Sequence, residues 1–419
     1  MLKNLKTLIP WSIQKNIKQF QIIGADGSHI YTKNKKIVDF TSGAMAVNLG
    51  HNNKYILEGF NNHYKTGISY VPSNFSTYER EKLSDRLTDI FNQTYYKKVL
   101  YTNAGAESNE FAIFLTKEYF RMNNIENRIR TLSFQNSFHG GSSIAASLVS
   151  GDIRRENKSY YYNLPLEPII NNPDQQDNGY GSLNQFEKEF KKNNVASILV
   201  EGSSGTAGCY LYPKGYFKKL KLLCEKYNVL MICDEVMSGW GRTGHFFAHQ
   251  EYEVNPDLIT TAKAITSGYV PLGAVIINDI VSDTFNDNKV MGGLTYSGHI
   301  LPCTIANRCI DLYQQNDYQI LDEVKSKNVY VTERCNKIVN NHSFVNDFRI
   351  NGLLGCFDLN LNETQLLKLS NMLLERGIYC LRMRHNLFIS PPLTIESSLL
   401  HNSFNTIDQV FHIFNEDNF

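Results

Sequence analysis

Two residues with complementary chemistry, Asp234 and Lys263, each follow a short apolar segment near the middle of the sequence. Residues 229–233 form an uninterrupted apolar run that ends on Asp234, which is typical of a buried strand that opens into a polar loop. Residues 257–262 lead in the same way into Lys263. In open parallel α/β sheets ligands bind at the carboxyl ends of the strands, so both side chains are predicted to reach one site. A lysine and an aspartate placed there suit pyridoxal 5′-phosphate (PLP), which binds a lysine as a Schiff base and pairs its ring nitrogen with an aspartate.

Each of these residues also has a simpler interpretation. Most lysines lie on charged, exposed surfaces, but Lys263 lies within a run of small and apolar residues at 261–265. Removal from water destabilises the ammonium, so this setting is expected to lower the pKa of Lys263 and make its amine a nucleophile and proton carrier. Asp234 could cap a helix or a turn, yet a carboxylate at the end of a buried strand needs a cationic partner.

The chain resembles the class III aminotransferases in Cys-Asp-Glu-Val-Met-Ser-Gly-Trp-Gly-Arg-Thr-Gly at 233–244, Pro-Asp-Leu at 256–258 and Thr-Ala-Lys-Ala-Ile-Thr-Ser-Gly-Tyr-Val-Pro-Leu-Gly-Ala-Val at 261–275. Gly-Gly-Leu-Thr-Tyr-Ser-Gly-His at 292–299 is most similar to the taurine–pyruvate and other ω-amino acid–pyruvate members. The resemblance extends from about residue 22 to 393. It implies a PLP enzyme of fold type I that moves an amino group from an ω-amino acid or amine, such as taurine or β-alanine, to a 2-oxo acid, with pyruvate expected first. It also implies a homodimer with shared active sites.

The resemblance gives cofactor roles to several other positions. Gly105 and Ala106 begin a helix predicted from 104 to about 122, and they correspond to the phosphate cradle, where backbone N–H groups and the helix dipole attract an anion. Phe138 corresponds to the aromatic ring that stacks on the pyridine, and Val236 is expected to pack on the opposite face.

Four further candidates depend on the resemblance. Thr295 corresponds to a threonine that binds the phosphate of the neighbouring subunit's cofactor. Glu201 is expected to point into the site, although a glycine follows it where the family carries proline. His139 is a candidate general base by residue type, but the resemblance indicates a structural, cofactor-side role. Met45 stands where the family often lines the substrate pocket with an aromatic residue, and it is equally compatible with a core position.

Carboxylate recognition is predicted near the C-terminus, where the family carries an arginine shortly before Pro-Pro-Leu. Leu381 occupies that position in the register most similar to the family, with Arg382 and Arg384 beside it. Alternate residues of a strand share a face, so the two arginines should point together, opposite to Leu381. The planar fork of Arg382 is the first candidate for binding the carboxylate of the 2-oxo acid, and Arg384 is the second.

Strand and helix patterns alternate through residues 98–277. This alternation predicts an α/β fold with a mainly parallel sheet, which would position the residues above. Residues 22–40 predict small antiparallel strands, and residues 151–180 predict a polar surface loop. We expect a large PLP-binding domain at 46–309, with 1–45 and 310–419 combining into a small α+β domain.

Composition excludes several other classes of protein. Hydrophobic residues make up 42% and charged residues 20% of the 419 positions, enough for a sizeable core. A net charge of +1 gives no general attraction to nucleic acid or to an anionic membrane, so the substrate should be small. The eight cysteines form no C-x-x-C pair, and no metal site is predicted. The first residues are too short in their apolar part for a signal peptide, no run of about 18 apolar residues exists, and a cytoplasmic location is expected.

Two alternatives to a working aminotransferase remain open. One is a PLP-binding protein without turnover that serves as a scaffold or regulator. The other is an aminomutase or decarboxylase on the same fold. Retention of Lys263, Asp234 and Thr295 together favours an active enzyme over a non-catalytic one, whereas only the segment 292–299 separates an aminotransferase from the second alternative.

Overall fold

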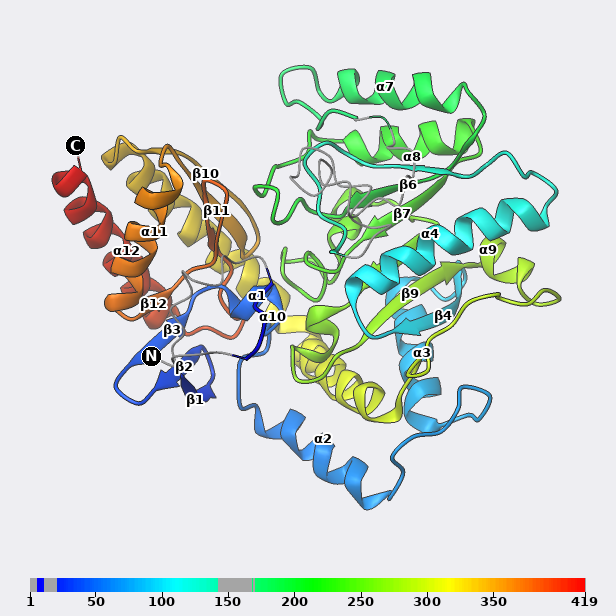
Figure 1. Ribbon diagram of the computed structural model, residues 1–419, viewed down its shortest axis with the longest axis horizontal. Coiled ribbons are helices and arrows are strands. Elements are labelled where there is room, and N and C mark those ends of the chain that lie inside the picture. The colour runs from blue at the N-terminus through cyan, green and yellow to red at the C-terminus, as the bar shows by residue number, and fades with distance from the viewer. Residues whose placement is uncertain (1–5, 11–20, 142–167, 169, 419) are drawn as a thin grey trace.

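The computed structural model describes residues 6–10, 21–141, 168 and 170–418. Its largest sheet has six strands in the order β4-β9-β8-β7-β6-β5 (Figure 1). Three neighbouring pairs are parallel, and of these strands only β9 runs in the opposite direction. The predicted α/β fold with a mainly parallel sheet is therefore confirmed. The strands are β4 (Tyr96–Thr102), β5 (Arg130–Leu132), β6 (Val195–Glu201), β7 (Leu230–Asp234), β8 (Leu258–Thr261) and β9 (Gly273–Asn278).

Helices cover both faces of this sheet, which explains why its central strands are largely apolar. β6 is buried along its whole length, and its side chains alternate between two apolar clusters. Ile198 packs in the cluster that contains residues of α7 (Tyr180–Phe190) and α8 (Tyr216–Lys226). Leu199 packs in the cluster that contains residues of α4 (Gly105–Met122), on the other face.

The two ends of the chain meet in a smaller α+β region, as predicted. One of its sheets has the order β1-β2-β3-β12, and β12 (Ile378–Tyr379) pairs in parallel with β3 (Lys36–Asp39). A second sheet has the order β10-β11-β14-β13, and the last helices of the chain lie with it, on the side of the molecule where both termini lie (Figure 1). The remaining elements here are β1 (Ile22–Asp26), β2 (His29–Thr32), β10 (Val345–Asn351), β11 (Leu354–Leu359), β13 (Arg382–Met383), β14 (Asn386–Ile389), α11 (Glu363–Glu375) and α12 (Ser397–Asn418).

A 42-residue helical segment, α10 (Ile300–Asn341), connects the two parts. Its backbone leaves the helical region at 315–318, where Asn316, Asp317 and Tyr318 have positive φ. The domain boundary predicted at 309/310 lies inside α10, so the domain limits stay a prediction. The other helices are α1 (Ser42–Met45), α2 (Lys54–Lys65), α3 (Tyr78–Phe91) and α9 (Asp279–Thr284), with short 3-10 helices η3 (Ala248–Tyr252) and η4 (Lys263–Thr266).

Most of the predicted surface loop at 151–180 lies outside the described residues. Of the described part, Ile170 forms a single parallel bridge with Phe134, and the residues from there to α7 are turns and irregular backbone. Among the described helices, none combines the length and apolar character that crossing a membrane requires.

Candidate active site

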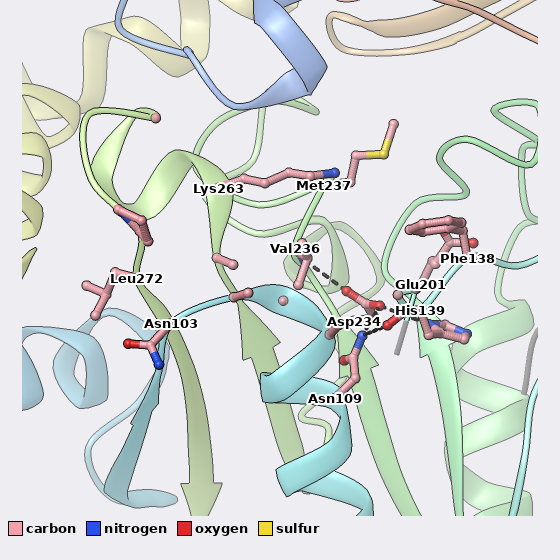
Figure 2. Close-up of a pocket in the computed structure, with 18 of the residues that line it drawn as sticks. Asn103, Asn109, Phe138, His139, Glu201, Asp234, Val236, Met237, Lys263 and Leu272 are labelled. Carbon is pink, nitrogen blue, oxygen red and sulfur yellow. Dashed lines mark hydrogen bonds and ion pairs between the residues drawn. The ribbon is translucent and has the colours of Figure 1, made fainter. Parts of the chain in front are cut away.

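A cavity of about 490 Å³ lies where β6, β7 and β8 end and α4 begins (Figure 2). This is the edge of the sheet at which α/β proteins bind their ligands. Most of the predicted cofactor residues line it, namely Gly105, Ala106, Phe138, His139, Glu201, Asp234, Val236 and Lys263.

Asp234 is the last residue of β7, and its carboxylate is 4% exposed. Its Oδ2 accepts from Nδ2 of Asn109 at 2.8 Å and from Nδ1 of His139 at 2.8 Å. Its Oδ1 accepts from the backbone N–H of Val236 at 3.0 Å. A carboxylate can only accept, so the proton between the two side chains belongs to Nδ1 of His139. Three donors therefore fix the orientation of the Asp234 carboxylate.

The donors to Asp234 are themselves held in place. Nε2 of His139 lies 2.8 Å from Oγ of Ser133, which lies 3.0 Å from Oγ of Ser137. Asn109 accepts from Oγ1 of Thr260 at 2.6 Å and also donates to the backbone oxygen of His139 at 2.8 Å. Figure 2 shows Asn109 and His139 both directed at Asp234. Because His139 ends a buried polar chain, its ring is held in position to orient Asp234.

Lys263 follows β8 and begins η4 with φ of 48°, in the left-handed region that non-glycine residues seldom adopt. Burial lowers the pKa of its amine, and the positive charge of Arg242 adds to this effect. The carboxylates of Asp234 and Glu201 act in the opposite direction without cancelling the shift. The amine is therefore easier to deprotonate, which a nucleophile and proton carrier requires.

Glu201 ends β6 directly beside Asp234 in the parallel ladder. Burial and the neighbouring Asp234 charge raise its pKa to about 8, although the backbone N–H groups of Gly205 and Phe138 donate to it. Among the described residues, no lysine or arginine forms an ion pair with it. Glycine at the next position is required by packing, because a Cβ on Gly202 would lie 2.4 Å from a carboxylate oxygen of Glu235.

The start of α4 is open to an anion. Its N-cap, Ala104, has no side chain that could satisfy the first N–H groups of the helix. A Cβ on Gly105 would lie 2.6 Å from Cγ1 of Val236, so glycine allows the helix to approach the cavity wall. With the amine of Lys263, the oriented Asp234 and the ring of Phe138, this arrangement fits the parts of PLP: its aldehyde, its ring nitrogen, its ring face and its phosphate.

Four predicted residues lie outside the cavity lining. Thr295 is exposed in this chain, and its backbone oxygen accepts from the hydroxyl of Tyr70 at 2.8 Å. Met45 is 1% exposed and packs in an apolar cluster with Met237, which does line the cavity. Met45 therefore supports the cavity wall from behind.

The two candidate arginines, Arg382 and Arg384, are also not among the residues that line the cavity. Their neighbours Leu381 and Met383 pack against the apolar cluster of Met45 and Met237. Because alternate residues of a strand share a face, Arg382 points away from this cluster. Its role in binding carboxylate stays a prediction, and these contacts do not support it.

Sequence reasoning missed Asn109, the second side-chain donor to Asp234. A signal was present, because Asn109 lies one helical turn after Gly105 and therefore shares its face of α4. Ser133 and Ser137 carried no such signal, since only the folded chain brings them to His139. Trp240 and Arg242, which follow Asp234 in the sequence, are fully buried outside the cavity.

A buried cluster of Cys233, Glu235 and His249 lies behind the site, with ligand-type atoms within 4.8 Å of one another. Hydrogen bonds already occupy the carboxylate of Glu235: Ser238 donates at 2.5 Å, and the N–H of Ala248, the N–H of His249 and Nδ1 of His249 donate at 3.1, 2.8 and 2.9 Å. The contacts of this cluster are thus accounted for by packing of the loop after β7.

Comparisons with known proteins identify the family of the chain. The family model described as "Aminotransferase class-III" matches residues 13–411. The chain is similar to the acetylornithine aminotransferase of Methanocaldococcus jannaschii, with 28% identity over 397 residues that cover 93% of each chain. It is also 30% identical over 356 residues to the adenosylmethionine-8-amino-7-oxononanoate aminotransferase of Staphylococcus aureus, covering 78% of this chain and 76% of that one.

Among solved structures, the taurine:2-oxoglutarate aminotransferase from Bifidobacterium kashiwanohense, in complex with PLP and glutamate, is similar with a TM-score of 0.90 and 28% identity. The match covers 98% of this chain and 96% of that one.

Proposed function

Because the chain belongs to the class III aminotransferase family, whose members depend on PLP, we propose that it moves an amino group from an ω-amino acid or amine to a 2-oxo acid in two half reactions. The single observation that carries the proposal is the placement of Lys263, with its lowered pKa, in one cavity with the oriented carboxylate of Asp234. A lysine and an aspartate in this relation suit PLP chemistry at a substrate amine, and the family match supports amino transfer as the reaction.

The residues of the chain have distinct tasks in this reaction. PLP, when bound, supplies an electron sink for the negative charge that develops on the substrate carbon. Lys263 would hold the cofactor and, once the substrate displaces its amine, carry a proton to or from that carbon. Asp234 would keep the ring nitrogen protonated, and Asn109 and His139 keep Asp234 oriented for that purpose. The open start of α4 would hold the phosphate.

The donor and the acceptor are the finer part of the proposal. The names of similar proteins differ in their amino donors: taurine, acetylornithine and, in a transaminase of Solanum lycopersicum that is 28% identical over 329 residues, gamma aminobutyrate. The segment 292–299 supports an ω-amino acid such as taurine or β-alanine as donor, with pyruvate as acceptor. Because the similar Bifidobacterium enzyme is a taurine:2-oxoglutarate aminotransferase, 2-oxoglutarate is the second acceptor to test.

We also propose a homodimer in which Thr295 serves the partner's cofactor phosphate. Large apolar side chains are exposed around Thr295, and one of them, Tyr296, has its ring centre 5.8 Å from that of Tyr70. Concentrated exposed apolar surface is typical of protein–protein interfaces. Tyr70 and Tyr296 are 40 and 56% exposed, and Ile68, Phe75, Tyr78 and Met291, which lie near them in the sequence, are 40, 58, 74 and 72% exposed.

The test is an assay of the purified protein loaded with PLP. Taurine, β-alanine, 4-aminobutyrate, ornithine and diamines are offered with pyruvate or 2-oxoglutarate, and the alanine or glutamate formed is measured. The proposal expects alanine from at least one ω-amino donor. A protein that binds PLP but forms neither product with any donor would favour the non-catalytic alternative. Release of CO₂ or isomerisation of the donor without amino transfer would favour a decarboxylase or an aminomutase.

A further inference from the structure

Arg242 is fully buried, with 0% exposure, in the loop that follows Asp234. Its guanidinium donates four hydrogen bonds, and all four acceptors are neutral. Nη1 donates to the backbone oxygens of Leu353 and Pro391 at 3.1 and 2.6 Å. Nη2 donates to Oγ of Ser42 and Oδ1 of Asn48 at 3.1 and 2.6 Å.

These acceptors come from three separate segments of the chain, and none belongs to the large sheet. Ser42 and Asn48 lie at and after α1, Leu353 lies in the turn between β10 and β11, and Pro391 follows β14. The backbone of Arg242 takes part as well, because its oxygen accepts from the N–H of Leu353 at 2.8 Å. A single side chain of the large domain is thus the meeting point of the N-terminal and C-terminal segments.

Close packing fixes this meeting point. A Cβ on Gly352, which has φ of 62°, would lie 2.4 Å from the backbone of Thr243 and 2.5 Å from the oxygen of Arg242. Asn48 also donates from Nδ2 to the backbone oxygen of Trp240 at 2.9 Å. The turn between β10 and β11 therefore packs directly against the loop that follows Asp234. The two backbones are so close that a side chain at position 352 would not fit between them.

Among the described residues no carboxylate lies at ion-pair distance from Arg242, and its Nε has no hydrogen-bond partner. Tyr313 and the buried carboxylate of Asp39 act on Arg242 from farther away, and both raise its pKa without cancelling the effect of burial. Burial lowers the pKa of Arg242 to about 10, so the side chain is still cationic at neutral pH. An unpaired buried charge is costly, and an apolar residue of similar volume would avoid this cost. The four acceptors that join the two domains are neutral, so a neutral donor could also bind them. Docking alone therefore does not explain why the side chain carries a positive charge.

We propose that Arg242 is a positioning residue with two effects on the cofactor site: its fork docks the small domain on the loop that follows Asp234, and its unpaired positive charge acts on the amine of Lys263. The inference rests on the proposed function only in that Lys263 binds PLP. It concerns a residue that does not line the cavity and contacts neither substrate nor cofactor.

The charges that act on Lys263 come from three directions. Asp234 at the end of β7 and Glu201 at the end of β6 favour its protonated form. Burial and Arg242 favour its neutral form. The loop of Arg242 also contacts the segment of Lys263 directly, because Nε1 of Trp240 donates to Oγ1 of Thr261 at 2.7 Å. Without Arg242, the two carboxylates would be opposed by desolvation alone, and the amine would be protonated to a higher pH.

The test compares Arg242→Gln with Arg242→Lys in the PLP-loaded enzyme. Glutamine removes the charge and most of the donors, whereas lysine keeps a charge but lacks the planar fork that reaches four acceptors. Two quantities are measured: the pH midpoint at which the visible absorbance of lysine-bound PLP changes, and the dissociation constant of PLP. Arg128→Gln is the matched control, because Arg128 is also buried and donates to four neutral acceptors, but at the far edge of the sheet.

Arg242→Gln is expected to raise the midpoint by about 0.5–1 pH unit, the effect of one charge acting through a partly screened interior. Arg242→Lys should leave the midpoint within about 0.2 unit of wild type. It should also weaken PLP binding roughly tenfold, an ordinary size for coupling between a remote contact and a binding site, because the loop that follows Asp234 is then held less firmly. Arg128→Gln should change neither quantity. An unchanged midpoint in folded Arg242→Gln, or the same shift in Arg128→Gln, would overturn the proposal. A wild-type protein without the lysine-bound absorbance would contradict the proposed function instead.

Discussion

Buried charges are used differently at the two edges of the large sheet. The amino edge is where β5, β6 and β7 begin, and the carboxyl edge is where they end, at the cavity. Arg128 at the amino edge and Arg242 near the carboxyl edge both have an Nε without a partner. Arg128 joins segments within one domain, whereas Arg242 joins two domains at the loop that follows Asp234. The acceptors of Arg128 are Val195, Asn228, Asn193 and Tyr227, at 2.8, 3.0, 2.6 and 2.9 Å.

Two buried glutamates show the same contrast more sharply. Glu189, at the end of α7 near the amino edge, accepts from Arg130 at 3.0 Å and from Lys192 at 2.6 Å. Burial acts to raise its pKa, but these two partners outweigh burial and hold the pKa below the usual value. Among the residues that the structure describes, Glu201 accepts from backbone N–H groups alone, and burial together with Asp234 raises its pKa to about 8. Pairing thus decides the direction of the shift.

The two edges differ in whether buried charged groups have ion-pair partners. At the amino edge the buried carboxylate is paired, which stabilises the fold. At the carboxyl edge Lys263, Glu201 and Arg242 remain without ion-pair partners among the described residues, which is expected where charged groups of a cofactor and substrate complete the set.

Lys263→Ala should abolish turnover and the visible absorbance of lysine-bound PLP, because no other group can replace the amine. Lys192→Ala removes an amine at the amino edge and should leave both unchanged. Absorbance spectra and single-turnover assays of the two variants check this. A borohydride-reducible PLP adduct in folded Lys263→Ala would show that another residue binds the cofactor.

Asp234→Asn should lower kcat by roughly 10²- to 10³-fold, the size of effect seen when one preorganised electrostatic group is removed. Asp257→Asn is the matched change, because Asp257 is a buried aspartate before β8 that accepts from Lys221 at 2.8 Å and from the N–H of Met231 at 2.7 Å. It should lower the free energy of unfolding but not kcat of the folded enzyme. Equal losses of kcat in both variants would remove the distinction between the edges.

Arg128→Gln should lower the free energy of unfolding by about 1.5–3 kcal/mol or more. A hydrogen bond from a charged donor contributes an amount in this range, and the substitution also leaves buried carbonyl groups without a donor. Denaturant unfolding monitored by circular dichroism measures the change. The kcat/KM of the folded variant should match wild type. A selective loss of activity would show that the amino edge is coupled to the site.

Glu201→Gln should change how stability depends on pH. The folded-state pKa of Glu201 is about 8, above the ordinary value of 4.5. Between these values the folded state binds more protons than the unfolded state, so Glu201 lowers the free energy of unfolding as pH rises, by at most about 1.4 kcal/mol per pH unit. The glutamine variant should therefore gain stability relative to wild type from pH 5 to pH 8, in unfolding measured without added PLP.

Glu189→Gln should change the pH dependence of stability in the opposite direction. The folded-state pKa of Glu189 is lowered, so its carboxylate stabilises the protein above the unfolded pKa, and this contribution is lost as pH falls. The variant should be less stable than wild type at pH 8, and the difference should shrink toward acid pH. If both glutamine variants respond to pH with the same sign, pairing is not what separates the two edges.

The sequence by itself determined the elements that reach the site and the residues that end them. Mostly apolar runs at 195–200 and 229–233 identified buried strands, since a strand covered on both faces needs apolar residues at nearly every position. Asp234, Lys263 and Gly105 were found because their local motif states both the residue type and its place at a strand end or helix start.

Only the tertiary structure decided how the charges at the site are supported. Asn109 and His139 meet on Asp234, and Arg242 meets Ser42, Leu353 and Pro391. These contacts join residues that lie far apart in the chain, so no local period or propensity encodes them. The face of Arg382 was likewise set by the packing of its neighbours. Local sequence patterns specify which segments form strands and helices. The packing of distant segments decides which charged side chains remain unpaired and which residues surround them.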